Sequence, residues 1–212
     1  AGGSGAPTRG GPAGGSGGRT KGTGRGGVPP ALAMAVICAL TFVCYLPVLS
    51  PTKEFTNWDD NVYVTEQPLV RSLDARNLAT IFNPATEVSL NYHPLTMLSL
   101  AWNYSTAKLD ARAYALTNLV LHVLNTALVF LLIGMLAPGR FWVAALTSLW
   151  FGIHPMHVES VAWVAERKDV LYALFFLLSL ISYARYLRSR NMLWLVATFA
   201  CFVLSILGKA MA

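Results

Sequence analysis

Residues 113–136 read AYALTNLVLHVLNTALVFLLIGML, an apolar run that contains a few polar side chains. A helix needs about 20 such residues to cross a bilayer, and this run is long enough. Comparable runs occupy residues 31–49, 170–187 and 192–207, and a shorter one occupies residues 141–153. The sequence therefore predicts an all-α, polytopic membrane protein with about five transmembrane helices. The third of these is short enough to be a re-entrant or interfacial segment instead.

The composition agrees with a membrane protein. Of the 212 residues, 55% are hydrophobic and only 12% are charged, and the mean hydropathy is +0.50. A typical soluble domain has about 25% charged residues. An ordinary soluble domain is therefore excluded.

The first 27 residues differ from the rest of the chain. They hold 13 of the 17 glycines and four basic residues without any acid, so they cannot bury enough apolar surface to offset the entropy of ordering them. We expect a disordered, glycine-rich basic tail over residues 1–30 and one membrane domain over residues 31–212. The tail carries +4 of the net charge of +6, so the basic balance does not indicate a nucleic-acid partner.

The run at residues 31–49 could also be a secretory signal peptide, because positive charge precedes it. Its apolar stretch is longer than the roughly 7 to 15 residues of a signal-peptide core, and no small-x-small cleavage motif follows it. We therefore interpret this run as a retained membrane anchor.

Positive charge sets the expected orientation. If the basic tail stays in the cytoplasm, the turns at residues 138–140 and 185–190 are cytoplasmic too, and both are basic and free of acid. Two polar segments, residues 50–112 and 154–169, then lie on the outer face and hold all ten acidic residues. We expect a multi-pass protein of a bacterial inner membrane with periplasmic outer loops, or of the endoplasmic reticulum membrane in a eukaryote.

The long outer segment contains the sequence FTNWDDNVYV, in which Asp59 and Asp60 are adjacent. In an extended or turn conformation the two side chains point in different directions. One of them can then face a reacting group while the other pairs with a cation or a backbone donor. A solvated turn with an Asx motif is an equal alternative.

The same outer segment contains two further helical patterns, at residues 73–83 and 94–109, with the mixed spacing of helices that lie in the membrane interface. His93 precedes the second of them and could simply be its cap. In the apolar run that follows, His122 and Asn125 are three residues apart and share a helix face. This favours hydrogen bonding to neighbouring helices over a functional role.

The short outer segment reads HPMHVESVAWVAERKD. His154, His157 and Glu159 lie close together in it and could bind a divalent cation, although their spacing is not diagnostic. Together with Arg167 and Lys168 they could instead hold a phosphate of a substrate. The structural alternatives are a polar helix cap for the histidines and snorkelling membrane anchors for the two bases.

The order of these motifs resembles a known family. A first span, the WDD loop, the NYHPL sequence, the AYALTNLVLH span and the HPMHVESVAWVAERKD segment are together similar to the transmembrane and tetratricopeptide-repeat O-mannosyltransferases, over residues 31–212. The HPxHxE part is the most specific, and the ERKD ending is more similar to bacterial members. The family continues into more spans and a repeat domain, whereas this chain ends at LGKAMA. This implies an amino-terminal fragment without the tetratricopeptide repeats.

The resemblance implies a type C glycosyltransferase that passes a sugar, mannose in this family, from a polyprenyl-phosphate carrier to a protein hydroxyl on the outer face, with inversion. It implies Asp59 as general base and Asp60 as its support. Arg167, Lys168 and Lys209 would stabilise the leaving phosphate. The implied partners are the lipid-linked donor, the protein acceptor and the bilayer. The cofactor is unknown, and the sequence does not require a divalent cation. The alternative functions are a non-catalytic membrane scaffold and a transporter.

Overall fold

The computed structural model describes residues 1–3, 5 and 28–209, so most of the predicted tail lies outside the described residues. The described chain is all-α, as predicted, and its strand-like pairing is limited to an isolated bridge between Val88 and Asn91. Its α-helices are α1 (Pro30–Cys44), α2 (Ala75–Ile81), α3 (Pro94–Ala107), α4 (Ala111–Leu136), α5 (Phe141–Ile153), α6 (Val158–Ala162), α7 (Arg167–Ser189) and α8 (Met192–Gly208).

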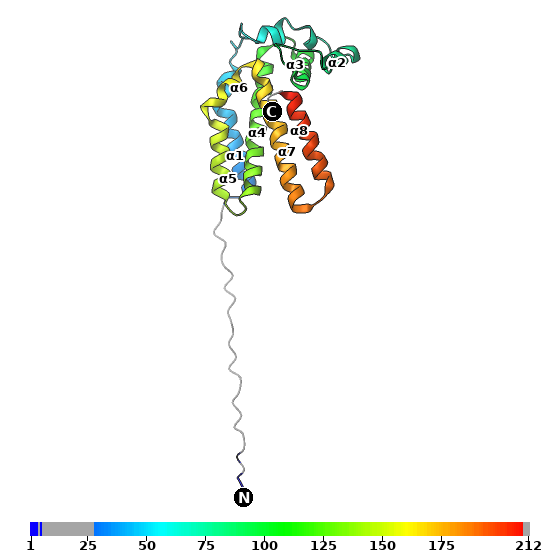
Figure 1. The fold of residues 1–212 in the computed structure, drawn as a ribbon. Coiled ribbons are helices and arrows are strands. Elements are labelled where there is room, and N and C mark those ends of the chain that lie inside the picture. Colours follow the sequence, from blue (N-terminus) through cyan, green and yellow to red (C-terminus); the bar gives the residue numbers. More distant parts are fainter. Residues whose placement is uncertain (4, 6–27, 210–212) are drawn as a thin grey trace.

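The long helices α1, α4, α5, α7 and α8 run side by side as a bundle (Figure 1). α4 packs against α1, α5 and α7, and α7 packs along α8. The segment between α1 and α4, which includes α2 and α3, covers one end of the bundle. We call the end of the bundle next to residues 50–110 and 154–166 the capped end.

In the described part of the chain, three segments are long and apolar enough to cross a membrane: Pro30–Leu49, Ala111–Leu136 and Val164–Ser189. α5 and α8 are apolar but shorter, with 13 and 17 residues. Large hydrophobic side chains stay exposed on the bundle, among them Trp142 at 68% and Leu193 at 74%. Exposed apolar surface on this scale is typical of contact with lipid. The fold is therefore that of a multi-pass membrane protein.

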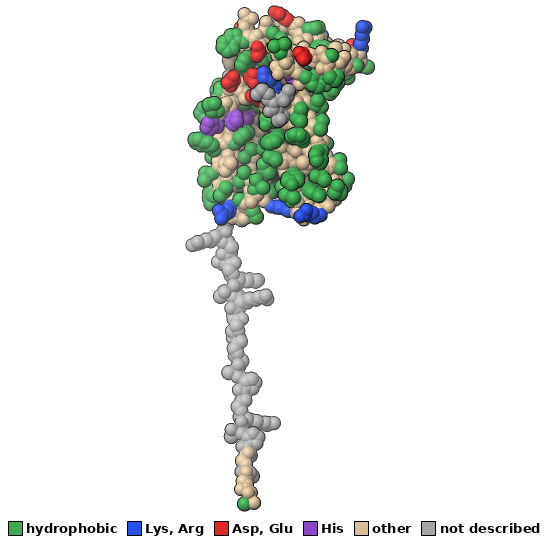
Figure 2. All heavy atoms as spheres, in the orientation of Figure 1, with side chains coloured by type: hydrophobic (Ala, Val, Ile, Leu, Met, Phe, Trp, Pro, Cys, Tyr) green, Lys and Arg blue, Asp and Glu red, His purple; other side chains and the backbone are tan. Residues whose placement is uncertain are grey.

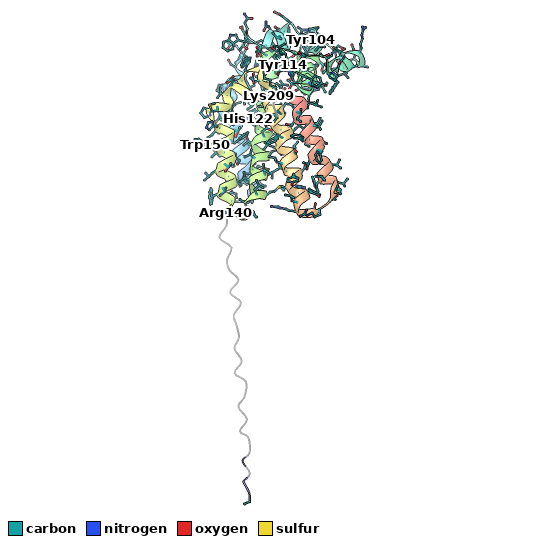
Figure 3. The ribbon with its side chains drawn as sticks, in the orientation of Figure 1. Tyr104, Tyr114, His122, Arg140, Trp150 and Lys209 are labelled. Atoms are coloured by element: carbon teal, nitrogen blue, oxygen red, sulfur yellow. The ribbon has the colours of Figure 1, made fainter. Side chains whose placement is uncertain are left out.

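The two ends of the bundle differ in charge, because basic side chains occur at both ends whereas acidic ones gather at one (Figure 2). The acidic side chains gather at the capped end, whereas a band of basic side chains marks the opposite end (Figure 2). Arg140, in the turn between α4 and α5, lies in this basic band (Figure 3). Near the end of α7, Arg188 donates to the carbonyl oxygen of Met135 in α4. This distribution agrees with the charge asymmetry that orients membrane proteins.

Polar side chains of α4 bond to the neighbouring helices, which confirms the prediction from their shared helix face. His122 Nε2 hydrogen-bonds with the carbonyl oxygen of Gly152 in α5 at 2.9 Å. Asn125 Nδ2 donates to the carbonyl oxygen of Val170 in α7, also at 2.9 Å. Both side chains are buried. These bonds hold α4 against α5 and α7 inside an apolar bundle, where water is not available as an alternative partner.

Gly152 marks the closest approach of α1, α4 and α5. A Cβ atom at this position would overlap Thr41 Oγ1 of α1 and would lie 3.0 Å from Thr126 Cγ2 of α4. We expect Gly152→Ala to destabilise the protein by about 1–3 kcal/mol, because an added methyl group forces well-packed helices apart. Thermal unfolding in detergent measures the effect.

Gly134→Ala is the matched control, because a Cβ atom at Gly134 would meet nothing within 4 Å. Alanine is the better helix former, so this change should leave the unfolding temperature equal or slightly higher. Equal unfolding temperatures for the two variants would contradict the close packing at Gly152.

Candidate functional site

Asp60 fixes the first loop to the start of α7. It is fully buried, and its Oδ1 accepts the backbone N–H of Ala165 at 2.8 Å. Its Oδ2 accepts the backbone N–H and the hydroxyl of Thr56, at 2.9 and 3.0 Å. A buried carboxylate with three donors is not a solvated turn residue. Asp60 instead holds its neighbour Asp59 at a defined place on the capped end.

Asp59 itself is only partly buried and lies one turn before Tyr63. Its carbonyl oxygen accepts the N–H of Tyr63 at 2.9 Å, where the π-helical turn Asn61–Thr65 begins. The Tyr63 ring is buried, and Lys168 Nζ lies 5.1 Å from its centroid. Tyr63 is therefore bonded through its backbone to Asp59, the predicted base, and its ring is covered by Lys168, which was predicted to contact a phosphate.

The pKa of Tyr63 reports the charges around this ring. Burial raises the pKa of the phenol, and the positive charge of Lys168 opposes that rise. The carboxylates of Asp59 and Glu166 raise the same pKa further. All three charged groups therefore act on Tyr63, and the contact of Lys168 with its ring marks the candidate site.

Two ion pairs supply the basic side chains of the site. Lys168 Nζ lies 2.9 Å from Glu166 Oε1, and Lys209 pairs with Asp169. Figure 3 places Lys209 at the capped end of the bundle. The side chains of Lys168 and Lys209 keep some exposure. An anionic ligand can therefore compete with Glu166 and Asp169 for these two lysines. When a phosphate replaces the carboxylate, each lysine ammonium group still has an anionic partner.

His93 belongs to this site as well. It stands at the N-cap position of α3, as predicted, but its side chain makes no capping hydrogen bond there. The buried ring stacks on Tyr63 with the centroids 5.2 Å apart, and Nε2 has no hydrogen-bond partner among the described residues. Burial, assisted by the charge of Lys168, lowers the pKa of His93 to about 4, so the ring is neutral at pH 7.

Arg167 does not occupy the place expected of a phosphate contact. Its side chain is fully buried. Its nitrogen atoms donate to protein acceptors on α3 and α4, namely Asn118 Oδ1, Ser99 Oγ at 2.8 Å and the carbonyl oxygen of Tyr114 at 2.9 Å. Neither a surface phosphate contact nor a snorkelling anchor fits this environment. Arg167 instead joins α7 to α3 and α4 and so positions the adjacent Lys168.

His154, His157 and Glu159 form a separate group beside the end of α5. His154 Nδ1 accepts a backbone N–H two residues further on, as expected for a polar cap. The ring of His157 packs 4.6 Å from that of Phe151, centroid to centroid. Burial, with the charge of His154, lowers the pKa of His157 and favours its neutral form. Glu159 is exposed in the first turn of α6.

The described residues contain no group of three or more His, Cys, Asp and Glu side chains placed to hold a metal ion. His154, His157 and Glu159 therefore do not come together as the cation site that their spacing allowed. Asp59 and Lys168 each contact Tyr63, whereas the two histidines stand in packing and capping positions. Tyr63 and His93 complete the candidate site, but no sequence motif marked either of them as functional. Tyr63 only follows the WDD loop, and His93 only precedes a proline.

The structure is that of an all-α, multi-pass membrane protein with carboxylates and lysines gathered at one end, and the comparisons with known proteins name a particular group. The chain is 34% identical over 122 residues to Protein O-mannosyl-transferase Tmtc1 of Drosophila melanogaster, covering 58% of this chain and 14% of that protein. It is 30% identical over 168 residues to Protein O-mannosyl-transferase TMTC1 of Mus musculus, covering 76% of this chain and 18% of that protein.

A third relative, Protein O-mannosyl-transferase TMTC2 of Mus musculus, is 34% identical over 124 residues, covering 56% of this chain and 15% of that protein. The chain is thus a distant homologue of these protein O-mannosyltransferases, and it spans less than a fifth of their length. No family model and no solved structure matches it.

Proposed function

We propose that the protein takes part in protein O-mannosylation as a membrane glycosyltransferase. It moves mannose from a polyprenyl-phosphate carrier to a protein hydroxyl on the outer face, with inversion at the anomeric carbon. The observation that carries the proposal is that Asp59 and Lys168 both contact the buried Tyr63, one through its carbonyl oxygen and the other over the ring, at the capped end of an apolar bundle. Distant homology to protein O-mannosyltransferases supports the same reaction.

The proposed mechanism needs a base and a phosphate site on opposite sides of the sugar. Asp59 removes the proton of the acceptor hydroxyl, and the oxygen then forms a bond to the anomeric carbon. The bond from that carbon to the phosphate oxygen breaks, and its electron pair leaves with the phosphate. Lys168 and Lys209 stabilise the negative charge that develops on this phosphate. Asp60 and Arg167 are positioning residues for Asp59 and Lys168.

We further propose that α5 and α8 cross the membrane as well, so that the bundle has five spans and the capped end lies outside. α5 and α8 would then place the loop at residues 154–169 and the end of α8 on the same side as the WDD loop. This side is periplasmic in a bacterial inner membrane and lumenal in the endoplasmic reticulum. The exposed apolar surface of α5 and α8 supports their contact with lipid.

Cysteine labelling tests this topology. Single cysteines at Glu66, Glu159 and Ser189, all exposed positions, are introduced into a chain without its three native cysteines. Each variant is treated in intact cells with a membrane-impermeant reagent. Five spans predict labelling at 66 and 159 but not at 189. If α5 does not cross, α7 begins on the inner side and ends on the outer side. Residue 189 would then be labelled and residue 159 would not, which would contradict the proposal.

A transfer assay tests the reaction. Membranes that contain the protein are mixed with radiolabelled mannosyl-phosphoryl-polyprenol and a peptide with a central threonine. We expect labelled peptide, and membranes from cells without the protein give the background. Recovery of intact donor and unlabelled peptide would overturn the proposed function. Transfer of glucose in preference to mannose, from a matched carrier, would overturn the choice of sugar.

A further inference from the structure

An open groove lined by two tryptophans lies beside the predicted base. Thr56, Asn57, Trp58 and Trp163 line a hollow of about 630 Å³. The two indole rings meet edge to face with their centroids 5.9 Å apart. The Trp58 side chain is 76% exposed. Such exposure is unusual for a tryptophan that does not lie in the hydrocarbon core of a bilayer.

Trp163 carries a second sign of a missing partner. Its indole Nε1 is buried and has no hydrogen-bond acceptor among the described residues. A buried N–H group without an acceptor costs about 1–3 kcal/mol. Because Nε1 has no exposed surface, a ligand in the groove removes that cost when the Trp163 ring turns its N–H toward an acceptor atom. The exposed ring of Trp58 and the unpaired N–H of Trp163 thus indicate one ligand with both an apolar part and an acceptor oxygen.

The place of the groove in the site selects the ligand. Trp58 precedes Asp59 in the chain, and Thr56 donates two hydrogen bonds to Asp60. The groove therefore adjoins the base, and no charged side chain lines it. The lysines that suit a phosphate, Lys168 and Lys209, belong to the ion pairs at the start of α7 instead.

We infer that this groove binds the acceptor, an uncharged extended polypeptide segment that carries the hydroxyl to be glycosylated. Its side chains lie against the Trp58 ring, and a backbone carbonyl oxygen accepts the Trp163 N–H. Tryptophan is among the residues that most often dominate protein recognition, because a large rigid ring gains contact area at a low entropy cost. This inference rests on the proposed function, which it extends to the acceptor side.

Peptide binding tests the inference without any need for transfer. The purified full chain in nanodiscs is titrated into a fluorescein-labelled ten-residue peptide of alanine and valine with a central threonine, and anisotropy is measured. We expect Trp58→Ala to weaken binding about tenfold or more. Trp163→Phe keeps the ring and removes only the N–H, and we expect about fivefold weaker binding. Trp142→Ala removes another exposed tryptophan, on α5, and should change nothing.

Three outcomes would overturn the inference. They are no binding by the unaltered chain, equal losses for Trp58→Ala and Trp142→Ala, and tryptophan-dependent binding of methyl mannoside in place of the peptide. The variant Asp59→Asn separates this inference from the proposed reaction. If transfer fails in every assay but the peptide still binds Asp59→Asn through Trp58, the inference about the groove is supported and the proposed reaction is contradicted. If Asp59→Asn abolishes transfer and no tryptophan variant changes peptide binding, the proposed reaction is supported and the inference about the groove is contradicted.

Discussion

Replacing Asp59 with asparagine is expected to lower the rate of mannose transfer by about 100- to 10,000-fold, the usual contribution of a general base. The asparagine side chain has almost the same shape, but its amide cannot take up the proton of the acceptor hydroxyl. The fold should persist, because Asp59 is only partly buried and the hydrogen bonds that hold the loop belong to Asp60. Donor binding should persist too, since Lys168 and Lys209 are unchanged.

The measurement compares initial rates of mannose transfer at equal amounts of folded protein, judged by elution from a sizing column. Glu66→Gln is the matched control, because Glu66 is an exposed carboxylate of the same loop and should transfer at the unaltered rate. A rate for Asp59→Asn within threefold of the unaltered protein would remove Asp59 from the base role. An equal loss in Glu66→Gln would point to a general effect of loop charge.

Replacing Arg167 with methionine is expected to destabilise the protein by about 3 kcal/mol. Methionine fills a similar volume, but it leaves Asn118 Oδ1 without its donor and removes the second donor of the Tyr114 carbonyl oxygen inside the protein. Each buried acceptor that loses its partner costs about 1–3 kcal/mol. These acceptors lie on α4, and Arg167 is the first residue of α7. The change should therefore also make the position of Lys168, the next residue of α7, less well defined.

Thermal unfolding in detergent, followed by the loss of soluble monomer, checks the stability of Arg167→Met. The control is Arg112→Met, because Arg112 is exposed near the start of α4 and should unfold at the unaltered temperature. Arg167→Lys keeps the charge but reaches fewer acceptors, so we expect an intermediate loss. If Arg167→Met keeps the stability of the unaltered protein but binds the lipid-linked sugar donor more weakly, the structural role of Arg167 is wrong. Arg167 would then contact the donor phosphate, as its sequence context suggested.

Helix formation and membrane character could be predicted from the sequence because they depend on local composition. The run at residues 113–136 is apolar enough to become α4 wherever its neighbours lie. The helices at residues 73–83 and 94–109 were also predictable, and they form α2 and α3. The crossing of α5 was not, because a 13-residue apolar helix suits both a short span and a segment within the membrane surface.

The candidate site could be predicted only in part. The short distance in sequence between Asp59 and Asp60 indicated two different roles, and Asp60 does differ from its neighbour in burial and in its donors. Arg167 and Lys168 are also adjacent, yet the sequence assigned both to a phosphate. Successive residues at the start of a helix point in different directions, so only one of them could face the site.

The sequence by itself determined that the chain forms apolar helices, that its acids lie in two polar segments and that bases mark the turns at residues 138–140 and 185–190. These properties follow from each segment alone, since the bilayer and the helix periodicity act locally. Only the tertiary structure decided that Arg167 is buried against Asn118, that Lys168 lies over the Tyr63 ring, and that Trp58 meets Trp163. The physical reason is that these contacts join residues 49 or more positions apart, and their geometry is set by how α3, α4 and α7 pack together.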